Sequence, residues 1–279
     1  PTITLYFLYS FTKTVSAGSG PDTVIPSFFN FLIDKNITKK IINLAKIEDC
    51  NVVEIRPGHG ALTDEILKSR PKSLSIIEKD LELFSKLKLK FIKNKKIHIF
   101  NNDILQFDLK KISKKKTIIF GNLPYNISSQ ILIKIIKLES LNNVEDIILM
   151  FQKELGEKII SKYPSKHYGR LSILSNYKLS VKKKFLVSPN CFYPKPKVNS
   201  MVIHFKPKKN YLFIKDLNNL EKVTNILFSN KRKMINKNIK KIFNSKEIGK
   251  LKKIKLSSRP SEIDPNIYYK IAMIYENQK

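Results

Sequence analysis

The sequence has 279 residues, 42% of them hydrophobic, and its 53 Lys and Arg against 23 Asp and Glu give a formal net charge of +30. This length allows one large and one small domain, and the charge predicts a polyanionic partner, with nucleic acid ahead of an anionic membrane surface. No apolar run approaches the ~20 residues of a membrane helix, and two distant cysteines without metal-ligand spacing to the four histidines indicate a reducing cytoplasm, with no disulfide scaffold and no metal site.

Short β-branched runs alternate with amphipathic stretches in the first part of the chain. The runs predict buried strands over 51–55, 73–77, 97–101, 117–121 and 146–151. The stretches between them predict helices over 61–69, 80–90 and 127–138. This alternation predicts an α/β fold with a doubly wound, mostly parallel sheet, in which ligands bind at the carboxyl ends of the strands.

The sequence pattern changes after about Val187, where prolines surround one strand-like run over 200–205. Lys-rich helical patterns follow over 216–229, 231–243 and 265–275. We therefore expect a large domain over 27–205 and a small basic helical domain over 206–279. Between Lys178 and Pro260, 23 basic residues face 3 acids. A solvated face is possible there, but a surplus this lopsided favours a phosphate-binding surface.

Polar residues stand where the predicted strands end. The first strand leads through Glu54 into a turn containing Gly58 and Gly60, where the backbone can approach a ligand closely. The second strand ends near Glu78, an acid that can bind both hydroxyls of a ribose, and the third leads to Asp103. Each acid alone suits solvent equally well, and the turn alone is weak evidence. Three acids at successive strand ends predict a nucleoside pocket.

The most informative segment is Asn122-Leu123-Pro124-Tyr125, which follows the apolar run 117–121. It puts an amide oxygen, a proline carbonyl and an aromatic face where a buried strand ends, and these could hold the amino group and ring of a nucleobase. A strand followed by a Pro turn is the plain alternative, because Asn and Pro are common turn residues.

These segments together resemble class I S-adenosylmethionine-dependent methyltransferases and, more narrowly, the KsgA family of rRNA adenine N6-dimethyltransferases. The resemblance runs from Asn30 to the C-terminus and includes Glu78 and Asp103. The matching segments follow one another in the order typical of the family: 30–34, 54–63, 121–128, 152–154, 168–172, 192–200 and 231–233. It implies a monomeric cytoplasmic enzyme that dimethylates two adjacent adenosines in a 3′-terminal hairpin loop of small-subunit rRNA, acting on the 30S precursor.

The resemblance also implies roles for single residues. The catalytic set is Asn122, Pro124 and Tyr125. The cofactor, S-adenosylmethionine, is expected to contact Asn30, Leu32, Glu54, Gly58, Gly60, Glu78, Asp103, Ile104 and Asn122. The RNA is expected to contact Phe192, Lys231, Arg232 and Lys233; Phe192 would stack on the target adenine, although ordinary core packing explains an aromatic there equally well.

Two departures from the family pattern stand out. Arg56 occupies a glycine position in the cofactor turn, where its side chain could crowd the methionine moiety, bond the methionine carboxylate or point outward. Residues 1–26 look foreign to the family and are not expected to belong to its core; their apolar stretch 2–11 lacks a preceding basic region, so no signal peptide is expected. Two further functions stay open, namely a resistance-type methyltransferase of large-subunit rRNA and a non-catalytic ribosome-assembly or transcription factor.

Overall fold

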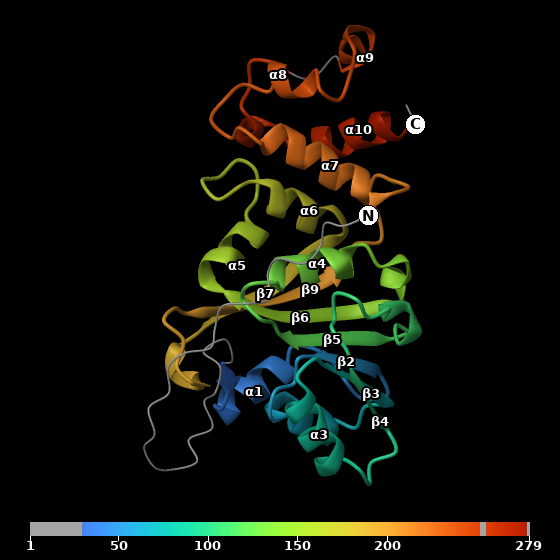
Figure 1. Ribbon diagram of the computed structural model, residues 1–279, viewed down its shortest axis with the longest axis vertical. Coiled ribbons are helices and arrows are strands. Elements are labelled where there is room, and N and C mark those ends of the chain that lie inside the picture. Colours follow the sequence, from blue (N-terminus) through green and yellow to red (C-terminus); the bar gives the residue numbers. More distant parts are fainter. Residues whose placement is uncertain (1–29, 252–254, 278–279) are drawn as a thin grey trace, which may run out of the picture.

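A seven-stranded sheet lies at the centre of the computed structural model, which describes residues 30–251 and 255–277 (Figure 1). The expectations for residues 1–26 lie outside the described residues. The strand order is β4-β3-β2-β5-β6-β9-β7. Its strands are β2 (Asn51–Ile55), β3 (Ser73–Glu78), β4 (Ile97–Asn101), β5 (Thr117–Asn122), β6 (Val144–Gln152), β7 (Leu179–Val187) and β9 (Ser200–Pro207). A separate two-stranded pairing joins β1 (Phe31–Leu32) to β8 (Phe192–Tyr193).

The doubly wound α/β fold predicted from the sequence is confirmed. Strands β2 to β6 pair in parallel, whereas β9 is antiparallel to both β6 and β7. From β2 the chain first builds outward through β3 and β4, then returns to add β5 on the other side. The strand order therefore reverses between β2 and β5, and the crevice at such a reversal is where open α/β sheets bind ligands.

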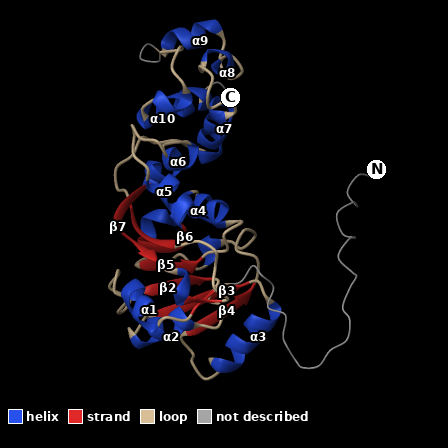
Figure 2. Ribbon diagram, turned by 90° about the vertical axis from the view of Figure 1, so that its left-hand side faces the viewer, coloured by secondary structure: helices blue, strands red, loops and turns tan. Residues whose placement is uncertain are grey.

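Both faces of the sheet are covered, which explains the continuous apolar runs of its inner strands. One face packs on α1 (Lys35–Ile42), α2 (Ala61–Lys68) and α3 (Leu81–Lys90), in a hydrophobic cluster that includes Val52, Ile118 and Phe120. The other face packs on α4 (Ser128–Ile136), α5 (Lys153–Ile160) and α6 (Arg170–Lys178), in a cluster that includes Val53 and Ile119. Figure 2 shows these two layers on either side of the strands.

The C-terminal helices extend from the second layer and lie at the far end of the elongated molecule from β4 (Figure 1). They are α7 (Leu217–Phe228), α8 (Asn236–Ile239), α9 (Ser245–Lys250) and α10 (Pro265–Glu276). The cluster on the α4 side of the sheet continues without a break into α7 and α10. The division at residue 205 stays a prediction. Within the described residues no helix is both long and apolar enough to cross a membrane.

Two sequence-based expectations differ from the structure. The predicted helix over 231–243 is wrong, because residues 230–233 form a turn and only Asn236–Ile239 are α-helical there. Asn230 lies in that turn, and asparagine favours turns over helix interiors. Strand β7 was not predicted, since its three consecutive lysines hide the apolar pattern; they suit an edge strand, where charge prevents pairing with another chain.

Candidate active site

Asn122 ends the central strand β5, and its amide is oriented by a residue far away in the chain. The Asn122 Nδ2 atom donates to the Asn30 carbonyl at 3.2 Å. Once the nitrogen is committed in this way, the Oδ1 atom remains as the acceptor of the amide. The sequence placed Asn30 and Asn122 in one cofactor site, and the structure brings them into direct contact.

Tyr125 and Pro124 follow in a tight turn that leads into α4. The Tyr125 hydroxyl lies 2.9 Å from Ser200 Oγ, at the start of β9, and burial raises the pKa of Tyr125. The Pro124 carbonyl accepts the Ile127 amide at 3.2 Å, which leaves its second lone pair for another donor. The contact with Ser200 fixes the aromatic ring, and no spacing rule in the sequence announces a partner 75 residues away.

The turn after β2 is built around two left-handed glycines. Gly58 has φ of 61° and Gly60 has φ of 85°, and Gly60 caps α2. A Cβ on Gly58 would lie 2.6 Å from Phe31 Cδ1, so the Phe31 ring lies directly against this backbone. Phe31 also packs on His59, with ring centroids 4.2 Å apart. Glycine is required at Gly58 both for its backbone angle and for the approach of Phe31.

Glu54 and Glu78 are deeply buried, at 1% and 2% exposure. Glu54 Oε2 accepts from Thr63 Oγ1 at 2.6 Å, and Glu78 Oε1 accepts from the Asp80 amide at 3.0 Å. The other oxygen of each carboxyl is buried without a hydrogen-bond partner among the described residues. Burial raises the pKa of Glu54 to about 8 and also raises the pKa of Glu78. These unpaired oxygens fit the hydroxyl and amino groups of a nucleoside cofactor.

Asp103 lies beside the end of β4 with both carboxylate oxygens engaged. Its Oδ2 accepts from Lys79 Nζ at 2.8 Å and its Oδ1 accepts from the Leu105 amide at 2.9 Å. The hydrogen bond from Lys79 lowers the pKa of Asp103. Ile104, next in the chain, is buried. Asn101 joins this edge to β3, since its Nδ2 donates to the carbonyls of Glu78 and Lys79. The predicted adenine contacts therefore adjoin the predicted ribose contact.

Arg56 points inward, which removes the outward alternative. It lines a small cavity at the glycine turn together with Asn30, Gly58 and Asn122. The cavity holds about 30 Å³, far less than the ~300–1,000 Å³ of a small-molecule pocket. The polar groups at this edge thus fit the cofactor chemically, but the cavity at the glycine turn is too small for the methionine moiety of the cofactor unless a side chain moves.

The aromatic predicted to stack on the target base is buried. Phe192 is 3% exposed and lies with Leu32, its partner across β1 and β8, in the hydrophobic cluster on the α1 side of the sheet. Its neighbour Tyr193 is 62% exposed and pairs with Phe31 on the other face of this ribbon. The core-packing interpretation of Phe192 agrees with this placement, and its role toward RNA stays a prediction.

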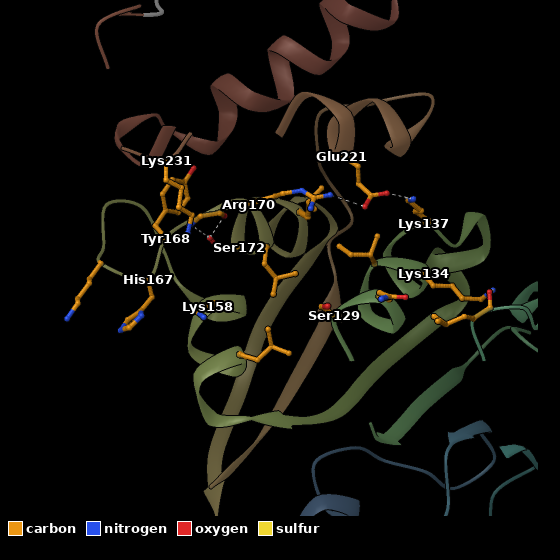
Figure 3. A pocket seen from close by; sticks show the side chains of 18 residues that line it. Ser129, Lys134, Lys137, Lys158, His167, Tyr168, Arg170, Ser172, Glu221 and Lys231 are labelled. Carbon is orange, nitrogen blue, oxygen red and sulfur yellow. Dashed lines mark hydrogen bonds and ion pairs between the residues drawn. The ribbon is translucent and has the colours of Figure 1, made fainter. Parts of the chain in front are cut away.

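A basic groove of about 800 Å³ extends from the first turn of α4 toward α7 (Figure 3). Leu105, two residues after Asp103, and Ser129, four after Tyr125, line the end near the strands. Six cations line it, from α4, α5, the loop before α6, the start of α6 and the loop after α7: Lys134, Lys137, Lys158, Lys166, Arg170 and Lys231.

The sequence did not predict this groove, because its cations come from segments that lie far apart in the chain and share no short motif. Glu221 of α7 is its one lining acid among the described residues, and it pairs with Lys137 and with Arg170. The predicted RNA contacts Lys231, Arg232 and Lys233 are exposed in the turn after α7. Lys231 lies over the start of α6, since a Cβ on Gly169 would be 3.8 Å from its Nζ.

Comparisons with known proteins agree on one family. A family model described as ribosomal RNA adenine dimethylase matches residues 27–277. The ribosomal RNA small subunit methyltransferase A of Pelagibacter ubique is 45% identical over 89% of this chain and 95% of its own length. The protein of the same name from Malacoplasma penetrans is 40% identical over 87% of this chain and 88% of its own length.

Two solved structures share the fold. A dimethyladenosine transferase from Plasmodium falciparum superposes with a TM-score of 0.70 at 24% identity, over 86% of this chain and 95% of that one. The 23S rRNA methyltransferase ErmE superposes with a TM-score of 0.65 at 20% identity, over 88% of this chain and 100% of that one.

Proposed function

The chain belongs to the ribosomal RNA adenine dimethylase family, and from that premise we propose that it uses S-adenosylmethionine to dimethylate the N6 amino groups of two adjacent adenosines in a 3′-terminal hairpin loop of small-subunit rRNA. The observation that carries the proposal is the orientation of Asn122, whose nitrogen is held by Asn30 so that its oxygen can accept a hydrogen bond from an amino group. The small-subunit names of the 45% and 40% identical relatives support the choice of subunit.

The chemistry starts from a poor nucleophile, because the lone pair of an adenine amino group is delocalised into the ring. The Asn122 Oδ1 atom and the free lone pair of the Pro124 carbonyl are the two acceptors for its N–H bonds. Hydrogen bonds from both N–H groups to these oxygens favour a more tetrahedral nitrogen with a localised lone pair. Tyr125, fixed by Ser200, offers its face to the target ring. The rate gain comes from positioning and preorganised dipoles.

S-adenosylmethionine supplies an electrophilic methyl group when it is bound. The residues that would hold it are the buried Glu54 and Glu78, with their unpaired oxygens, and Asp103 with Ile104. Glu78 suits the ribose hydroxyls and Asp103 suits the adenine amino group. With a pKa of about 8, Glu54 is largely protonated near neutral pH and can donate as well as accept.

The basic groove and the exposed cations at 231–233 are the proposed surface for the RNA backbone. A net charge of +30 favours fast association with an RNA-rich particle, and phosphate contacts would position the loop without reading its sequence. The target base must leave its stack to reach Asn122, which suits an adenosine in a loop. We place the monomeric enzyme in the cytoplasm, on the 30S precursor.

Methyl transfer from labelled S-adenosylmethionine tests the proposal. Undermethylated 30S subunits should accept methyl groups on adenine N6, whereas 50S subunits and naked RNA should not. Asn122→Ala should lower the rate by about 10²–10³-fold, with a much smaller loss of cofactor affinity by calorimetry, because Asn122 is only one of several expected cofactor contacts. Asn142→Ala is the matched control, because Asn142 is exposed in the short 3-10 helix Glu139–Asn143 that leads into the amino end of β6. Transfer to 50S subunits would favour the resistance-type alternative, and 30S binding without any transfer would favour the non-catalytic one.

A further inference from the structure

Arg56 is an unusual residue for its position. Its φ of 58° lies in the left-handed region that costs an arginine conformational energy. Its backbone amide donates to the Ile77 carbonyl at 3.0 Å, which ties the turn to the end of β3. Strained residues persist where the surrounding structure holds them, and such positions often cluster at functional sites. The backbone strain at Arg56 is therefore consistent with a functional position for its side chain.

The side chain goes into the cofactor site. It lines the cavity at the glycine turn with Asn30, Gly58 and Asn122, and that cavity holds only about 30 Å³, against the ~300–1,000 Å³ of a small-molecule pocket. Its positive charge acts on two groups that belong to different halves of the site, the Glu78 carboxyl and the Tyr125 hydroxyl. Arg56 thus lies between the predicted ribose contact and the predicted amine site.

Electrostatics favours this inward position. Burial raises the pKa of the Glu78 carboxyl, and the guanidinium of Arg56 opposes that rise. Burial also lowers the pKa of Arg56, and Glu78 opposes this change in turn. Each charge partly compensates the desolvation of the other, in a place where a cofactor would otherwise supply the partners.

We infer that the Arg56 side chain occupies the cofactor pocket and must move out of the pocket before S-adenosylmethionine can bind. This inference rests on the proposed function, because it assumes that Glu78 and Asn122 mark a cofactor site. The binding-competent state is then only the fraction of molecules in which Arg56 has moved out, and the apparent affinity is reduced by that fraction. Arg56 sets the affinity of the site without contacting the reacting atoms.

The test is a titration of S-adenosylhomocysteine, without RNA, into the wild type and two variants. Arg56→Gly removes the side chain and the backbone strain; Arg56→Asn shortens the side chain but keeps a residue that tolerates positive φ. Both should bind about tenfold more tightly than the wild type, as expected if roughly a tenth of wild-type molecules are open. Arg70→Gly is the matched control, because Arg70 also has positive φ, at 53°, but is exposed and pairs with Glu48.

Each result decides the matter. Tighter binding in both Arg56 variants, with Arg70→Gly like the wild type, supports the inference. Unchanged or weaker binding in a folded Arg56 variant overturns it, as does binding by none of the proteins up to millimolar ligand. If circular dichroism shows that both Arg56 variants are unfolded, Arg56 is a structural part of the turn and the inference also fails. Tighter binding without methyl transfer to 30S subunits would overturn the proposed function alone.

Discussion

The buried carboxyl of Glu54 makes the stability of this protein depend on pH in a defined direction. Its pKa is about 8 in the folded chain and 4.5 in its ordinary state, mainly because burial disfavours the charged form. Below the lower value both states are protonated. Between the two values the unfolded chain has lost a proton that the folded chain retains, so the free energy of unfolding falls as pH rises.

The magnitude follows from linkage. One proton of difference changes the free energy of unfolding by about 1.4 kcal/mol per pH unit. Going from about pH 5.5 to about pH 7.5 should therefore remove ~2–3 kcal/mol of stability through Glu54 alone. Glu54→Gln keeps the shape and cannot titrate, so its stability should lack this part of the pH dependence. Its amide nitrogen would stand where the Oε1 atom has no partner, which costs stability equally at all pH values.

Urea unfolding of the ligand-free proteins at several pH values, at constant salt, measures the effect. The quantity to compare is the difference between wild type and Glu54→Gln, because the other titrating groups are present in both proteins; Glu78 is among them, and its charge contributes to the raised pKa of Glu54. Glu48→Gln removes an exposed carboxylate and should leave the pH dependence close to that of the wild type. Parallel wild-type and Glu54→Gln curves between about pH 5 and pH 8 would refute the assignment of a raised pKa to this carboxyl.

Two further predictions concern ligands. Asp103→Ala should weaken S-adenosylhomocysteine binding by about 1–3 kcal/mol, the usual cost of an unpaired buried group; an unchanged dissociation constant by calorimetry would remove Asp103 from the pocket. Charge reversal of the three exposed cations at 231–233 should flatten the salt dependence of RNA affinity, by roughly 0.7–0.9 in log–log slope for each phosphate that the variant no longer neutralises. Reversal of the three exposed lysines within 93–96, in the loop before β4, should leave the slope unchanged.

The order of the strands along the chain could be predicted because each inner strand is buried on both faces. Such strands appear as unbroken β-branched runs, and β2, which is buried throughout, has the predicted bounds. The edge strand β4 also has its predicted bounds, although it is only partly buried. Parallel strands end at one edge, so residues that follow these runs must gather there. Glu54, Glu78 and Asp103 could therefore be predicted to share one pocket from sequence order alone, and the resemblance added Asn122. The motifs then indicated the family and, through it, the cofactor expected in this pocket.

The partners of these residues depend on contacts that no local pattern encodes. The bond between Asn122 and Asn30 joins residues 92 apart, and the Tyr125 hydroxyl meets Ser200 across 75. Apolar periodicity reports which side chains are buried, not which distant group each one meets. The direction of Arg56 and the burial of Phe192 are likewise decided by packing, since a turn arginine suits solvent and a ligand cavity equally well in sequence. In the folded chain the charge of the Glu78 carboxyl acts on Arg56 and favours its inward position.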